Sequence, residues 1–201
     1  MKVIVAIVMA LLCAPAYSQQ GLSPKLSQFL LDHPGAYKVL TDVLQEANSK
    51  RPVHIYYFYV NAQAHQPTMH RLLEGESILG VFVVENQSPL SECVDILFEL
   101  LNSKGERRFK ELRQKAASGR ISKQEYVREF LKEEFRAVIA TKKMLPDLWL
   151  SEKEASESPQ YKWFKEVPTE FEEFLVYRSK GELSQDNTDY EKQYDAIRAL
   201  R

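Results

Sequence analysis

Apolar residues recur at helical spacing near the start of the chain and again in its second half. The first such stretches predict two short helices, over residues 24–32 and 36–47, with a break at His33-Pro34-Gly35. Ser88-Pro89 then precedes a long apolar run, and a serine cap followed by a first-turn proline is typical of a helix start. Because apolar residues fill most of that run, we expect this helix to be nearly buried.

Two further helices are predicted after this buried one. Residues 106–117 keep helical spacing and are followed by Gly119, a residue that commonly ends helices. Ser122 and Glu125 have the spacing of a capping box, which predicts the start of a long helix that ends before Pro146. The chain is therefore predicted to be mainly helical.

The pattern changes in two stretches of β-branched and aromatic residues. Residues 53–60 and 78–84 have the composition of strands, and a polar segment separates them. The simplest interpretation treats that segment as a loop between two antiparallel strands, so the expected fold class is α+β with a small antiparallel sheet. Aromatic residues on both faces of the first strand indicate a strand covered on both sides, with an aromatic binding platform as the alternative.

The chain divides into three parts by composition. Residues 1–18 have a short basic start, an apolar segment and small residues before Ser18, as a cleaved signal peptide does. The apolar segment is shorter than the roughly 20 residues of a transmembrane helix, so we expect a secreted or periplasmic protein without a membrane span. Residues 19–150 are the expected main domain, and 151–201 a helical extension that packs back on it through large apolar residues. Within the extension, Ser151 to Pro159 is polar and acidic and is interpreted as a solvated link.

Composition excludes several classes of protein. The 27 lysines and arginines are matched by 28 acidic residues, so no basic surplus exists to hold nucleic acid. Two cysteines are too few for a disulfide scaffold, and Cys93 alone would remain after removal of the signal peptide. We expect the Cys93 side chain to act as a small buried hydrophobe.

One carboxylate lies inside an apolar helical run. Zinc peptidases with an H-E-x-x-H motif place two histidines four residues apart on a helix, and the glutamate between them activates water. Glu99 matches that glutamate, whereas Phe98 and Asn102 stand at the two histidine positions. In the alternative interpretation, Glu99 belongs with Glu92, Asp95 and Asn102 to the solvated face of an amphipathic helix.

The stretch 98–102, the turn 119–122 and the pair Glu133-Glu134 together resemble bacterial secreted metallopeptidase-like (zincin-like) domains, with F-E-x-x-N in place of H-E-x-x-H. The resemblance covers roughly residues 53–145 and implies a zincin-like core. It also implies that Glu99 occupies the position of the catalytic base, and Glu133 or Glu134 that of a carboxylate metal ligand. Since two metal ligands are replaced, we expect a non-catalytic binding module without a cofactor.

Two alternatives to this binding module remain open. A metal-dependent hydrolase would hold zinc with Glu133 or Glu134 and the histidines His65 and His70. An envelope structural or assembly component would act through its surface alone.

A basic helix supplies the candidate binding residues. Arg107, Arg108 and Arg113 lie on the helix predicted over 106–117, Lys115 follows them, and Arg120 lies beyond its end. These cations could bind an acidic protein or an anionic envelope component, although a solvated charged face is the plainer interpretation.

Overall fold

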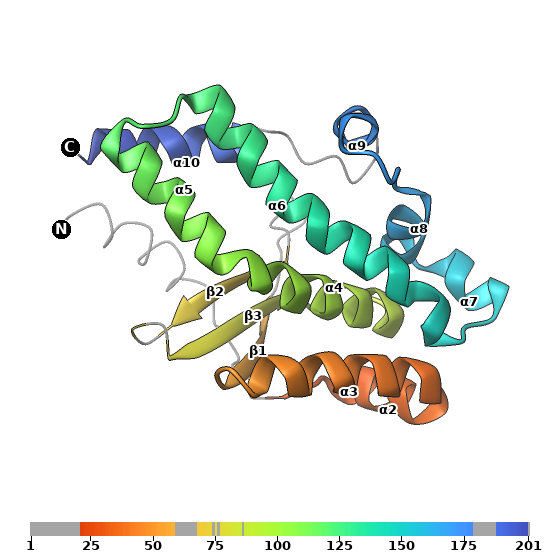
Figure 1. The fold of residues 1–201 in the computed structure, drawn as a ribbon. Helices are drawn as coiled ribbons and strands as arrows, with labels where there is room; N and C mark the ends of the chain where they lie inside the picture. Colours follow the sequence, from red (N-terminus) through yellow and green to blue (C-terminus); the bar gives the residue numbers. More distant parts are fainter. Residues whose placement is uncertain are drawn as a thin grey trace.

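A computed structural model describes residues 21–58, 68–73, 75, 77–85, 87–178 and 188–200. It is an α+β fold, mainly helical with a small sheet, as the sequence predicted (Figure 1). The expected signal peptide, residues 1–18, and His65 lie outside the described residues. The elements, in chain order, are α2 (Pro24–Asp32), α3 (Pro34–Asn48), β1 (Val53–Phe58), β2 (Met69–Leu73), β3 (Ile78–Val84), α4 (Pro89–Asn102), η1 (Ser103–Gly105), α5 (Glu106–Ser118), α6 (Lys123–Met144), η2 (Leu145–Leu148), α7 (Glu152–Glu157), α8 (Pro159–Glu166), α9 (Phe171–Arg178) and α10 (Thr188–Ala199).

The sheet is mixed, with strand order β1-β3-β2. Strand β1 pairs parallel to β3, with Val53 opposite Leu79, so the predicted antiparallel pairing of these two strands is wrong. The segment between them contains β2. The chain reverses direction after β2, so β2 is the strand that pairs antiparallel to β3, with Leu73 opposite Ile78. Because that side of β3 is filled by its neighbour in sequence, β1 joins at the opposite edge.

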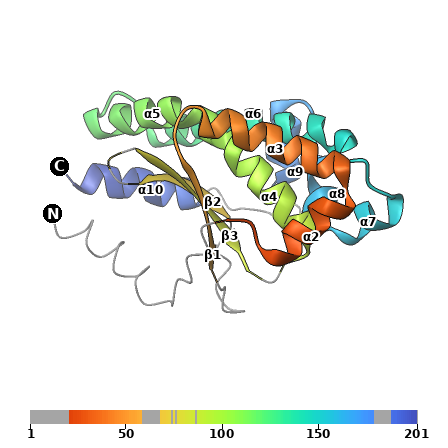
Figure 2. The same ribbon diagram turned by 90° about the horizontal axis from the view of Figure 1, so that it is seen from below.

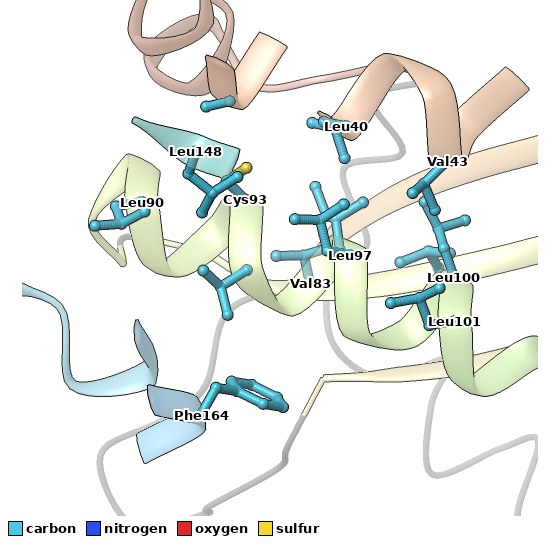
Figure 3. Packing of buried hydrophobic residues seen from close by; sticks show 14 of the residues in the cluster. Leu40, Val43, Val83, Leu90, Cys93, Leu97, Leu100, Leu101, Leu148 and Phe164 are labelled. Carbon is cyan, nitrogen blue, oxygen red and sulfur yellow. The ribbon is translucent and has the colours of Figure 1, made fainter. Parts of the chain in front are cut away.

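Helix α4 is the centre of the fold. Figure 1 shows it between the α2–α3 pair and α6, and Figure 2 shows the α2–α3 pair in front of it when the molecule is seen from below. Its side chains Cys93, Leu97 and Leu100 are buried among residues of α3, β3 and η2, such as Leu40, Val83 and Leu148 (Figure 3). This burial confirms the predicted helix and the role of Cys93 as a buried hydrophobe.

The predicted helix boundaries follow local chemistry. The side chains of Ser23, Ser88 and Ser122 accept hydrogen bonds from backbone N–H groups in the first turns of α2, α4 and α6. Ser122 and Glu125 form the predicted capping box. Gly119 ends α5 with φ of 70°, a left-handed conformation that favours glycine.

The chain after residue 150 packs against both parts of the core. Phe164 and Phe174 are buried in the main cluster around α4. Ser151 to Pro159, interpreted above as a solvated link, instead contains helix α7. It forms because Ser151 and Glu154 make a second capping box, and Glu154 also accepts a hydrogen bond from the His33 ring at 2.6 Å.

A second, smaller cluster lies between α5 and α6, and α10 covers it. Phe109, Leu112, Tyr126 and Phe130 form its centre, and α10 packs Tyr190, Tyr194 and Ile197 against it. Among the helices described here, none has both the length and the apolar character that a membrane crossing requires.

Candidate functional site

Three acidic residues of α4 are buried instead of facing water. Glu92 is 5%, Asp95 9% and Glu99 3% exposed, so the prediction of a solvated polar face is wrong for these residues. Glu92 accepts hydrogen bonds from the Tyr57 hydroxyl at 2.5 Å and the Ser23 hydroxyl at 2.9 Å. Because β1 and the start of α2 supply these partners, tertiary packing makes burial of this carboxylate tolerable.

Glu99 binds His70, and His70 also binds Glu106. The His70 ring donates from Nδ1 to Glu99 at 2.8 Å, and its Nε2 lies 3.4 Å from a carboxylate oxygen of Glu106. Burial by itself lowers the pKa of His70, but hydrogen bonds to Glu106 and Glu99 outweigh it and raise the pKa to about 9. His70 is therefore an imidazolium at neutral pH, which joins β2 to α4 and α5.

The ion pairs of His70 with Glu99 and Glu106 occupy side chains that would otherwise be available to bind a metal ion. Both ring nitrogens of His70 face carboxylates, and burial raises the pKa of Glu99 although its hydrogen bond with His70 opposes the change. A histidine must be neutral to bind a metal, whereas this one holds two protons. The geometry around Glu99 favours a structural role for this carboxylate.

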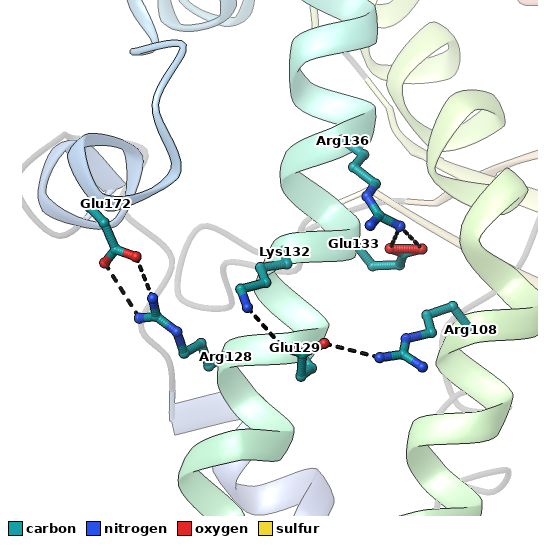
Figure 4. A network of polar contacts seen from close by, with 7 residues as sticks. All are labelled: Arg108, Arg128, Glu129, Lys132, Glu133, Arg136 and Glu172. Carbon is teal, nitrogen blue, oxygen red and sulfur yellow. Dashed lines mark hydrogen bonds and ion pairs between the residues drawn. The ribbon is translucent and has the colours of Figure 1, made fainter.

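Glu133 and Glu134 point to different partners. Glu134 is buried and accepts from Arg178 at 2.9 Å and from the Tyr190 hydroxyl at 2.6 Å. Glu133 pairs with the exposed Arg136 on the same helix (Figure 4). Within the described ranges, no group of three His, Cys, Asp or Glu side chains is placed to hold a metal ion.

Asp95 lies between the two networks. Its carboxylate accepts a hydrogen bond from the Gln87 amide at 3.0 Å. Burial raises its pKa to about 7, and the charges of Glu99 and Glu92 act in the same direction, against the effect of Gln87. Asp95 is thus half-protonated near neutral pH.

A basic groove of about 300 Å³ opens between α5 and α6 near the turn at Gly119. The lining residues on each helix are three or four positions apart, so they lie on one face of that helix. One face of α5 and one face of α6 thus form the two walls of the groove. We call this site the α5–α6 groove, and its lining consists of Arg108, Leu112, Lys115, Arg120, Ile121, Glu125, Arg128 and Glu129.

The two arginines on the walls are already paired. Arg108 donates to Glu129 at 3.0 Å, and Glu129 also accepts from Lys132 at 2.8 Å (Figure 4). Arg128 pairs with Glu172 of α9. Hydrogen bonds from Lys132 and then Arg108 lower the pKa of Glu129, so this carboxylate stays ionised. Each wall cation therefore lies beside a carboxylate of the protein.

The cations nearest the turn are different. Arg120 donates from Nε to the Ser118 hydroxyl at 2.8 Å, and among the residues that the structure describes neither Arg120 nor Lys115 pairs with a carboxylate. The other lining carboxylate, Glu125, accepts from the backbone and hydroxyl of Ser122. The groove therefore carries uncompensated positive charge at its end near Gly119.

The structure separates the three arginines that the sequence grouped as binding residues. Arg108 lines the groove, whereas the side chain of Arg107 is 93% exposed and pairs with Glu111. Arg113 lies 3.4 Å from Glu106, and its guanidinium stands over the Phe130 ring at 5.6 Å. The sequence analysis did not identify Arg128 as a binding residue. The short turn between α5 and α6 could have indicated it, because this turn places Arg128 on a helix that runs antiparallel to α5.

A second surface has the aromatic character noted in the sequence. Tyr56 of β1 stacks on Phe82 of β3 with ring centroids 5.0 Å apart, and Arg71 of β2 lies 4.5 Å over the Phe82 ring. These side chains are half-buried and contact one another. The groove is therefore the better candidate site.

No protein-family model, no curated protein and no solved structure matches the chain. Its function must be inferred from the residues and their geometry.

Proposed function

We propose that the chain is an exported, non-catalytic binding protein that recognises an anionic ligand through the α5–α6 groove. Export is supported by the signal-peptide pattern of residues 1–18. The observation that carries the binding proposal is the pair of cations Lys115 and Arg120, which lack an acidic partner in the described part of the chain and lie beside two arginines already paired with carboxylates.

The groove has the properties of a preformed anion site. Arg108 and Arg128, one on each wall of the groove, already pair with Glu129 and Glu172 in the absence of a ligand. The apolar side chains of Leu112 and Ile121 also line the groove. Contact with apolar atoms lowers the local dielectric constant, which strengthens attraction between the cations and an anion.

The non-catalytic part of the proposal rests on the surroundings of Glu99. A general base must reach a water or a substrate, and Glu99 is buried with its carboxylate bound to His70. In this proposal the carboxylates to which the zincin-like resemblance gave catalytic and metal-binding roles form ion pairs instead, Glu99 with His70 and Glu134 with Arg178.

The proposal is tested by anion binding to the mature protein, residues 19–201. Thermophoresis would measure affinity for sulfate, citrate and polyglutamate at low and high salt. We expect at least one of these anions to bind, more tightly at low salt, and the Lys115→Gln/Arg120→Gln variant to bind about tenfold or more weakly.

Arg107→Gln is the matched control, because it removes a cation from the same helix but outside the groove. Its affinity should equal that of the unmodified protein. Absence of binding to every anion at low salt, or equal affinity of the double variant, would contradict the proposal.

A further inference from the structure

We infer that the α5–α6 groove is selective for a phosphate monoester, with the phosphoryl group bound between Lys115 and Arg120. This inference rests on the proposed function and names the ligand class of the same site. It follows from the balance of charge, the kind of donors and the apolar lining of the groove.

The charge balance of the groove matches a dianion. Its lining has four cations, Arg108, Lys115, Arg120 and Arg128, against the two carboxylates of Glu125 and Glu129. Those carboxylates are engaged within the protein, Glu129 by Arg108 and Lys132 and Glu125 by Ser122. Arg108 pairs with Glu129 and Glu111, and Arg128 pairs with Glu172. Lys115 and Arg120 are then the lining cations without a carboxylate partner in the described part of the chain, and a doubly charged group would neutralise both, whereas a single carboxylate would leave one uncompensated.

The two uncompensated cations supply complementary donors. The Nε of Arg120 donates to Ser118, which orients the guanidinium plane, and its terminal nitrogens have no partner among the residues that the structure describes. A guanidinium can bind two oxygens of one phosphoryl group, and the Lys115 ammonium can bind the third as a compact charge.

The apolar lining favours an ester over a free inorganic ion. Leu112 and Ile121 line the groove next to the cations, and its volume of about 300 Å³ exceeds the needs of a phosphoryl group alone. Leu112 is already buried, so the organic part of a monoester would cover the accessible part of Ile121 and gain free energy from burial of that apolar surface.

Binding should depend on pH through the ligand and not through the groove. The charged groups that line the groove are Arg108 and Lys115 of α5, Arg120 of the turn, and Glu125, Arg128 and Glu129 of α6; Glu111 of α5 pairs with Arg108, and Glu172 of α9 pairs with Arg128. Hydrogen bonds from Ser122 lower the pKa of Glu125, and those from Lys132 and Arg108 lower that of Glu129, so both stay charged at mildly acidic pH. A phosphate monoester loses its second charge below a pKa of about 6, so affinity should fall as pH drops through that value.

The test compares two ligands that share an aromatic ring. Titration calorimetry on residues 19–201 would measure phenyl phosphate, a dianion, against benzoate, a monoanion, above and below about pH 6. We expect phenyl phosphate to bind about tenfold or more tightly than benzoate above that pH, with the difference shrinking below it. Lys115→Gln and Arg120→Gln should each weaken phenyl phosphate binding, and Arg107→Gln should not.

The outcomes separate this inference from the broader proposal. If benzoate or sulfate binds as tightly as phenyl phosphate, and the Lys115 and Arg120 variants lose that binding, the groove is an anion site and the phosphate inference is wrong. If no anion binds, both fail.

A second experiment distinguishes a lipid headgroup from a soluble monoester as the source of the phosphoryl group. Cosedimentation would use vesicles of phosphatidylcholine with and without phosphatidic acid. Phenyl phosphate binding together with retention on phosphatidic acid vesicles would support a lipid headgroup, and phenyl phosphate binding without that retention would support a soluble monoester.

Discussion

At the scale of single residues, partners distant in sequence decide the role of each charge. Glu92, Asp95 and Glu99 have the spacing of a solvated helix face, and the sequence alone favoured that interpretation. Their partners come from the start of α2, from β1, from β2 and from the segment before α4. Since none of these contacts follows from local spacing, their burial could not be predicted.

The raised pKa of Asp95 predicts a specific pH dependence of stability. Its pKa is about 7 in the folded protein against 3.8 for an aspartate side chain in water, so folding favours the protonated form. The contribution of Asp95 to the free energy of unfolding is therefore fully present below the pKa of Asp95 in the unfolded chain. It is lost as pH rises from there through about 7. Asp95→Asn keeps the shape and an acceptor for Gln87 without the charge, and should raise the free energy of unfolding by up to about 4 kcal/mol at about pH 8.

Denaturant unfolding of Asp95→Asn at several pH values measures this effect. The gain should shrink toward zero as pH falls to about 4, because Asp95 is then protonated in the folded protein. Asp42→Asn is the control, since Asp42 lies in an exposed pair with Lys38 and should change stability by less than about 0.5 kcal/mol. A destabilised Asp95→Asn at alkaline pH would refute the account of this carboxylate.

At the scale of elements, local signals predicted helices well and long-range pairing poorly. Ser23, Ser88 and Ser122 cap their helices through contacts within three residues, so the sequence could locate these starts. The order of the strands is a matter of pairing between distant segments, which no local pattern reveals, and β2 was not recognised because its His70 and Arg71 interrupt the apolar pattern. Helix α7 was missed although its capping box, Ser151 with Glu154, is present in the sequence.

Helix α10 is held to the fold partly by one buried hydrogen bond. Tyr190 donates to Glu134, which also accepts from Arg178. Tyr190→Phe keeps the ring against Phe130 but removes the hydroxyl, so we expect a loss of about 1–3 kcal/mol in the free energy of unfolding. Hydrogen exchange should show faster exchange of α10 amides, with α4 amides affected only through the global change.

Tyr37→Phe is the matched control for this substitution, because Tyr37 is 53% exposed at the start of α3. It should leave both stability and exchange in α10 unchanged. Unaltered protection of α10 in Tyr190→Phe would show that Glu134 does not anchor this helix.

At the scale of the whole molecule, the groove arises from the return of the chain at Gly119. This turn sets α5 and α6 side by side, so cations more than a dozen residues apart in sequence meet across one depression. The sequence identified the basic character of α5 and named Arg108, but it could not separate Arg108 from Arg107 and Arg113, which point elsewhere. The direction of a side chain around a helix becomes decisive only when the partner helix is placed.

The most direct test of the groove is a nuclear magnetic resonance titration of the ¹⁵N-labelled protein, residues 19–201, with phenyl phosphate. This measurement locates binding without altering any residue. Our account predicts shifts concentrated in the amides of α5, the turn at Gly119 and the first half of α6, with little change in β1–β3. Shifts centred on the sheet, or no shifts at all, would contradict the assignment of the α5–α6 groove as the binding site.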